Sequence, residues 1–170
     1  MQDSLLILEK YRKSPNRGAG ASRPKRVYSS PRGEIYFKFD MTYNEMCAEL
    51  FSYALSFPLE VKTAEVQLAI SGTVLGIASY DIGLYEEPDD RNSYSVKDFL
   101  HLKGFIQMCL FDYLIMNEDR HAGNWGIMDN GIAPLFDHNY TFGGDIPIAG
   151  VPTVKSTHTI PYRLYDQKGR

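Results

Sequence analysis

The sequence predicts an α+β fold with two parts: a small, mostly antiparallel sheet with one helix over residues 1–85, and a reduced helical part over residues 86–170. β-prone runs joined by turn residues fill most of the first half, at 26–39 and 61–79. A long apolar stretch, 96–116, follows and ends abruptly in a polar loop. With 170 residues, 44% of them hydrophobic, the chain can form two small lobes that share a cleft.

The first segment, residues 3–13, has the pattern of a short amphipathic helix. Its apolar run, 5–8, is too short for a signal peptide, and no run in the sequence approaches the length of a membrane span. The formal charge of −3 gives no electrostatic argument for nucleic-acid binding. The cysteines, Cys47 and Cys109, lie in apolar helical patterns and suggest no disulfide framework. We therefore expect a cytoplasmic protein that binds neither membrane nor, directly, nucleic acid.

Residues 14–26 are rich in Pro, Gly, Ser and Arg, which is typical of either a linker or a phosphate-binding loop. Gly18 and Gly20 would let backbone amides approach phosphate oxygens closely. Ser22 and Lys25 would add a hydroxyl and a positive charge. Because a Gly-x-Gly pair alone is weak evidence, both interpretations stay open.

The next segment predicts a hairpin with strands 26–30 and 34–39 around a Pro- and Gly-containing turn. Lys38 is an isolated cation in the run IYFKF at 35–39. Lys38 would lie either on the solvent-facing side of a surface strand or in a functional site.

Residues 42–57 predict a helix, because Thr42 as N-cap and Glu45 three residues later form a capping-box signature. Glu45 and Glu49 lie one turn apart, so either could orient Lys38. The predicted apolar face of this helix comprises Tyr43, Met46, Cys47, Leu50, Phe51 and Ala54.

A second hairpin is predicted from strands 61–70 and 73–79, which completes a sheet of four or five strands. Residues 80–84 then form a connection, and the acidic stretch 86–92 marks the boundary between the two parts. We expect one long helix, capped by Ser95 or Ser93, that runs to Met116 at the end of the apolar stretch.

The polar loop at 117–126 has the sequence NEDRHAGNWG. The predicted hairpin 125–136, with a Asp-Asn-Gly turn, returns Asp137 towards Asn124, so that Asp119, Asn124 and Asp137 converge. Phosphoryl transfer needs such a set: one Asp to accept the proton of the attacking hydroxyl, and an Asn and a second Asp to hold magnesium. The alternative is a turn in which these side chains make only local hydrogen bonds.

This loop, together with LFD at 135–137, resembles the catalytic loop and the metal-binding Asp of HipA-like kinases, in the atypical, phosphatidylinositol-kinase-like branch of the kinase superfamily. The resemblance implies a compact bilobal protein-kinase-like fold, with ATP and Mg²⁺ as cofactors. It implies that Asp119 is the catalytic base and that Asn124 and Asp137 bind the metal. The usual acceptor in this family is a Ser or Thr of a protein. The resemblance also makes a toxin-type kinase one of the expected functions.

The resemblance extends to GASRPK at 20–25, which fits the Gly-x-x-x-Pro-Lys pattern of the family's Gly-rich loop. It therefore implies that Gly18, Gly20, Ser22 and Lys25 belong to the nucleotide site. In that family a serine of this loop can be autophosphorylated and displace the loop, which makes Ser22 a candidate for regulation.

The resemblance also assigns roles in the sheet. Lys38 corresponds to the lysine that neutralises the α- and β-phosphates. An Asn-Glu pair opens the helix at 42–57, which favours Glu45 over Glu49 as the partner of Lys38. The segment 80–84, which contains Asp81, corresponds to the hinge beside the adenine.

The chain departs from the family beyond the metal-binding Asp, where only residues 138–170 follow in place of a sizeable helical portion. We expect an activation-type loop and an irregular tail there. Because this portion is short, we hypothesise a protein partner that completes the lobe, or an antitoxin-like partner.

Three alternatives remain. The same machinery could phosphorylate a small molecule or a lipid headgroup. A regulatory module could bind the nucleotide without turnover. A metallohydrolase would use His121, Asp137 and His138, although the sequence has no His-Glu-x-x-His motif.

Overall fold

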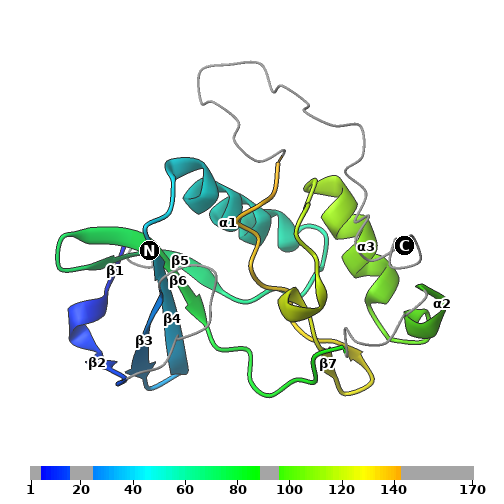
Figure 1. Cartoon of the computed structure of the whole chain (residues 1–170), viewed down its shortest axis with the longest axis horizontal. Helices are drawn as coiled ribbons and strands as arrows, with labels where there is room; N and C mark the ends of the chain where they lie inside the picture. Colours follow the sequence, from blue (N-terminus) through cyan, green and yellow to red (C-terminus); the bar gives the residue numbers. More distant parts are fainter. Residues whose placement is uncertain (1–4, 16–24, 89–95, 143–170) are drawn as a thin grey trace, which may run out of the picture.

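The computed structural model of the chain describes residues 5–15, 25–88 and 96–142. A curled sheet lies at one end, two helices lie at the other, and a third helix, α1, runs between them (Figure 1). This arrangement confirms the predicted α+β class.

The sheet has six strands in the order β1-β5-β6-β4-β3-β2. Both predicted hairpins are confirmed, since β3 pairs antiparallel with β4 and β5 with β6. The central pair, β4 and β6, places Lys38 opposite Ile77. The strands are β1 (Leu6–Ile7), β2 (Arg12–Lys13), β3 (Lys25–Ser30), β4 (Gly33–Phe39), β5 (Val66–Ser71) and β6 (Val74–Tyr80).

The helix predicted at 3–13 is wrong, because its described residues form β1, a 3₁₀ turn (Leu8–Lys10) and β2. β1 pairs with β5 and β2 pairs with β3, so this short segment bonds to both ends of the four-stranded core and curls the sheet. Leu8 is fully buried in the core that the curled sheet encloses. Pairing with strands distant in sequence, which local periodicity does not register, overrides the helical pattern here.

The helix α1 (Tyr43–Ser56) begins with the predicted capping box between Thr42 and Glu45. Its predicted apolar face is wrong. Tyr43 and Phe51 are 63% and 60% exposed. The side chains that α1 buries are mostly polar: Glu45, Ala48, Glu49, Ser52 and Ser56. This polar stripe finds hydrogen-bond partners inside the protein, so its burial is not visible in hydrophobic periodicity.

The single long helix predicted before the polar loop is also wrong, since the described part of the stretch divides into α2 (Val96–Phe99) and α3 (Phe105–Leu114). Gly104 between them has φ +86°, a left-handed conformation that a helix interior does not allow. The backbone of Lys103 instead bonds to the hairpin formed by β7 (Ile127–Met128) and β8 (Gly131–Ile132). The break lets Phe99 fold back against Phe105 in a second hydrophobic core.

The predicted hairpin after the polar loop is confirmed by β7 (Ile127–Met128) and β8 (Gly131–Ile132). Asp129 and Asn130 both have positive φ, as a type I′ turn requires. Leu135 then forms a bridge with Thr63, which ties this part of the chain to the segment that leads into β5. No helix in the described ranges is long and apolar enough to span a membrane.

Candidate active site

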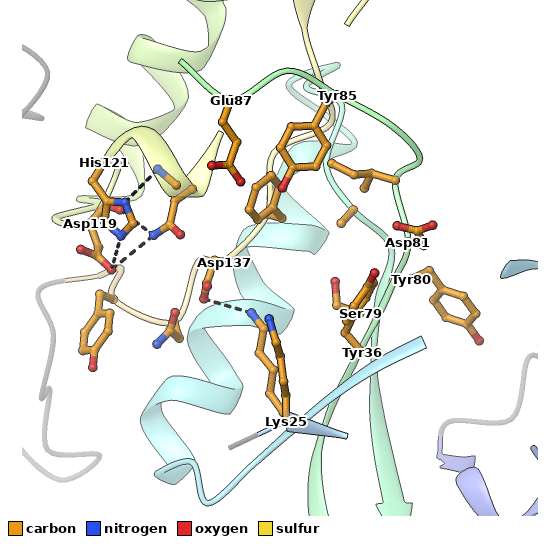
Figure 2. Close-up of a pocket in the computed structure, with 18 of the residues that line it drawn as sticks. Lys25, Tyr36, Ser79, Tyr80, Asp81, Tyr85, Glu87, Asp119, His121 and Asp137 are labelled. Atoms are coloured by element: carbon orange, nitrogen blue, oxygen red, sulfur yellow. Dashed lines mark hydrogen bonds and ion pairs between the residues drawn. The ribbon is translucent and has the colours of Figure 1, made fainter. Parts of the chain in front are cut away.

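A cavity of about 710 Å³ lies between the sheet and the polar loop. Its volume falls in the range of small-molecule pockets, roughly 300–1,000 Å³. Figure 2 shows Asp119 and His121 on one side, Tyr36, Ser79 and Asp81 on the other, and Asp137 between them. Of the residues that the sequence predicts for the site, the structure brings these to the cavity: Lys25, Lys38, Asp81, Asp119, Asn124 and Asp137. Gly18, Gly20 and Ser22 lie outside the described residues.

Lys38 extends from β4 and pairs with two carboxylates. Its Nζ lies 2.5 Å from Oε1 of Glu49 and 3.0 Å from Oδ1 of Asp137. Burial on its own would lower the pKa of Lys38, but these two carboxylates outweigh it and raise the pKa above its ordinary value. Lys38 therefore carries its positive charge inside the protein.

The partner of Lys38 is thus Glu49, and the prediction of Glu45 is wrong. The carboxylate of Glu45 accepts a hydrogen bond from the Thr42 backbone N–H at 2.7 Å, and so it caps α1. Glu49, one turn further along the buried stripe, is 1% exposed and faces β4. Capping and ion pairing require different positions on the helix, and one glutamate cannot perform both.

Asp137 follows the β7–β8 hairpin and has φ +60°, the left-handed region that non-glycine residues rarely adopt. Such backbone conformations persist where surrounding contacts hold them, and they are concentrated at functional sites. The side chain is 36% exposed, so its carboxylate faces both Lys38 and the cavity.

Asn124 ends the 3₁₀ turn Ala122–Asn124 and orients Asp119. Its Nδ2 donates to the backbone carbonyl of Asp119 at 2.8 Å and to Oδ2 of Asp119 at 3.3 Å. Because the amide nitrogen of Asn124 donates to Asp119, its amide oxygen Oδ1 is the atom that could coordinate a cation. This oxygen and the carboxylate of Asp137 are the ligand type that Mg²⁺ prefers, and Mg²⁺ keeps several waters, so two protein side chains fit it.

His121 lies beside Asp119 at the mouth of the cavity and is 46% exposed. Its Nδ1 accepts a hydrogen bond from the Gly123 N–H at 3.1 Å, while its Nε2 lies 3.9 Å from Oδ2 of Asp119. The ring thus supports the turn that carries Asn124.

Arg120 lies behind the cavity, fully buried, and all five of its N–H donors have acceptors. Nε and Nη2 donate to the two carboxylate oxygens of Asp112, each at 2.9 Å. Nη1 donates to the backbone carbonyls of Asn124 and of Phe136, the latter at 3.0 Å. The remaining Nη2 donor reaches Nε2 of His138 at 3.0 Å. One guanidinium therefore fixes the backbone beside both candidate metal ligands.

Sequence reasoning missed two members of this network. Asp112 on α3 also accepts from Nδ2 of Asn117 at 2.8 Å, and Oδ1 of Asn117 in turn accepts from the Asp119 N–H. The signal for Asp112 was available, since it is a lone acid in the apolar helix before the loop. Asn117 opens the loop motif at 117–126, but the motif suggested no separate role for it.

His138 is buried, and the pKa of its imidazole is well below the ordinary value because of burial and the positive charges of Arg120 and Lys38. The neutral ring accepts a hydrogen bond from Arg120. It therefore does not support the alternative in which His138 and Asp137 bind a metal together. Within the described ranges, no group of three or more His, Cys, Asp or Glu side chains is arranged to hold a metal ion.

At the other end of the cavity, Tyr36, Tyr80 and Tyr85 supply aromatic walls, and of these only Tyr80 lies in the connection predicted at 80–84. The backbone N–H of Asp81 donates to the carbonyl of Glu34 at 3.0 Å. The amide at position 81 is therefore engaged within the protein, and Asp81 lies at the edge of the cavity (Figure 2).

No protein-family model matches the sequence, and no curated protein matches it. Solved structures do match. The proinflammatory kinase CtkA of Helicobacter pylori superposes with a TM-score of 0.65 at 20% identity, covering 84% of this chain and 62% of that one. HipA of the Shewanella oneidensis MR-1 toxin–antitoxin system, solved with HipB and operator DNA, superposes with a TM-score of 0.52 at 14% identity, covering 77% of this chain and 45% of that one. The chain thus spans less than two thirds of the length of either neighbour.

Proposed function

Because the chain has a HipA-like kinase fold, we propose that it is an ATP- and Mg²⁺-dependent phosphotransferase that phosphorylates Ser or Thr of a protein. The observation that carries this proposal is the presence in one cavity of Asp119, Asn124, Asp137 and the charged Lys38, which is only 17% exposed. A base, a pair of oxygen ligands and a fixed cation are the parts that kinase chemistry needs.

In this proposal Asp119 accepts the proton of the acceptor hydroxyl while the hydroxyl oxygen bonds to the γ-phosphorus. The bond from that phosphorus to the β,γ-bridging oxygen breaks, and ADP leaves with the electron pair. Asn124 holds the Asp119 carboxylate through its amide nitrogen. When bound at Asn124 and Asp137, Mg²⁺ would supply charge neutralisation for the phosphates.

Lys38 would neutralise phosphate charge in the same site, and Glu49 would hold it in place. Lys25, which lies on β3 opposite Lys38, would add a second positive charge to the cavity. Ser22 is the proposed autophosphorylation position.

The experiment is to measure intact mass after incubation with Mg²⁺-ATP for the unmutated protein, Asp119→Asn and Glu118→Gln. Glu118 is a matched control, because it is the exposed acid next to Asp119. We expect added phosphate on the unmutated protein and on Glu118→Gln but none on Asp119→Asn. Mapping the phosphate to Ser22 supports autoregulation.

The same preparations are assayed for ATP consumption and for a rise in melting temperature with Mg²⁺-ATP. ATP consumption with a small-molecule or lipid acceptor, and none with proteins, would move the proposal to a kinase of that class. Stabilisation by Mg²⁺-ATP with no turnover would make the protein a nucleotide-binding module. Without stabilisation or turnover, the nucleotide site itself is refuted.

The likeness to HipA, which was solved with HipB and operator DNA, supports an antitoxin-type protein partner for this chain as well. Co-expression with the product of a neighbouring gene, followed by size-exclusion chromatography, tests it. Failure of that product to co-elute or to suppress turnover counts against the partner.

A further inference from the structure

We propose that His138 is a positioning residue, which keeps both candidate magnesium ligands in register with the Lys38–Glu49 pair by its contacts to Arg120 and Glu49. The inference rests on the proposed function, because it concerns the geometry of the same site. It assigns a role to a residue that the proposed chemistry leaves unused.

The side chain of His138 faces the polar loop. Arg120 has only donors, so Nε2 of His138 must accept the hydrogen bond from Nη2 at 3.0 Å, and the ring proton therefore lies on Nδ1. The same guanidinium holds the carbonyls of Asn124 and Phe136. Phe136 immediately precedes Asp137. The acceptor on His138 thus completes the set of contacts that places Asn124 and Asp137.

The backbone of His138 faces the other way. Its N–H donates to Oε2 of Glu49 at 3.2 Å, while Oε1 of the same carboxylate binds Lys38. The next residues continue along α1, since Oγ1 of Thr141 lies 3.3 Å from Oγ of Ser52. A single residue therefore joins the guanidinium of the loop to the ion pair of the sheet and α1.

Packing alone does not account for a histidine at this position. The ring is 3% exposed and stands edge-on to Phe111, with centroids 5.8 Å apart. A phenylalanine would make the same aromatic contact, but it would leave one N–H of the buried Arg120 without an acceptor. An unpaired buried donor is costly, and the guanidinium is expected to shift to relieve it. That shift would displace the carbonyls beside Asn124 and Asp137.

The test compares the unmutated protein with His138→Phe, His138→Asn and His138→Gln. Phe keeps the ring contact without an acceptor. Gln supplies an amide oxygen that can reach Arg120, and Asn supplies the same amide one methylene short. His101→Gln is the control, because His101 is an exposed histidine near α2, outside the cavity lining. The readout is the Kd of a fluorescent ATP analogue measured with Mg²⁺ and with EDTA.

We expect the Kd with Mg²⁺ to rise about tenfold or more for the Phe and Asn variants, and the Kd in EDTA to change less than about twofold. His138→Gln should restore most of the Mg²⁺-dependent affinity. A purely structural role would weaken binding equally in both conditions. The asparagine variant preserves the test if His138→Phe does not fold.

The proposal is overturned if the Phe and Asn variants keep the unmutated Kd with Mg²⁺, or if Gln loses as much affinity as they do. Failure of the proposed function is distinguishable, because the unmutated protein would then bind no nucleotide in either condition. In that event the role of His138 falls with it.

Discussion

The molecule has one ion pair behind the polar loop, Arg120 with Asp112, and one beside the sheet, Lys38 with Glu49. The two pairs differ in whether all of their N–H donors are used within the protein. The pair of Arg120 and Asp112 is fully buried, and every N–H of the guanidinium is used within the protein. Lys38 is 17% exposed, and its described contacts, Glu49 and Asp137, use two of the three N–H donors of an ammonium group. We call Arg120 with Asp112 the closed pair and Lys38 with Glu49 the open pair. The closed pair can only hold the backbone of the loop in place, whereas the open pair has an N–H donor left for a ligand.

The closed pair predicts the largest effect on stability. Asp112→Asn keeps the shape of the side chain but leaves the guanidinium of Arg120 as an uncompensated buried charge. We expect the free energy of unfolding to fall by roughly 3–5 kcal/mol in urea denaturation. Glu118→Gln, an exposed acid nearby, should change it by less than about 0.5 kcal/mol. Equal stability of the two variants would show that the closed pair does not hold the loop.

Arg120→Lys separates charge from geometry within the closed pair. Lysine retains the charge but has three donors in place of five, so at least two buried acceptors lose their bond. We expect a loss of about 2–3 kcal/mol in unfolding free energy, together with lower turnover because Asn124 and Asp137 lose backbone support. If the variant is as stable and as active as the unmutated protein, Arg120 contributes only its charge and not its hydrogen-bond geometry.

Lys38→Met tests the open pair. Its cost in stability should be smaller, about 1–2 kcal/mol, because the backbone N–H of His138 still donates to the Glu49 carboxylate and Asp137 is 36% exposed to solvent. In the proposed kinase, turnover should fall by about 10²-fold or more, since the charge proposed to neutralise the phosphates is lost. The matched control is Lys62→Met at an exposed lysine. If Lys38→Met destabilises the protein as strongly as Asp112→Asn while retaining turnover, the comparison between the two pairs is reversed.

The elements that the sequence predicted correctly have local signals. The turn residues of both sheet hairpins, the Thr42 and Glu45 capping box and the Asp-Asn-Gly turn each act over a few residues. The errors have non-local causes: the segment 5–13 pairs with distant strands, and Lys103 bonds to a hairpin that follows it by many residues. Local periodicity cannot register either contact.

The candidate site shows the same division. Residue types and spacing in the loop led to Asp119, Asn124 and Asp137, which the structure places at one cavity. Asp112 and His138 act through Arg120, and their roles depend on how α3, the loop and α1 pack together. Glu45 was favoured over Glu49 because an Asn-Glu pair opens the helix, although the capping box already offered Glu45 a structural role.

The smallest effect concerns these two glutamates and sharpens the definition of the open pair. Glu45→Gln should change unfolding free energy by less than about 0.5 kcal/mol, because glutamine also serves in a capping box. Glu49→Gln removes the negative charge that holds Lys38, so turnover should fall at least about tenfold while the capping box stays intact. Steady-state kinetics of the two variants side by side make the measurement. If Glu45→Gln is the slower enzyme, α1 must turn its other glutamate to Lys38 during catalysis, and the open pair described here belongs to a resting arrangement of the site.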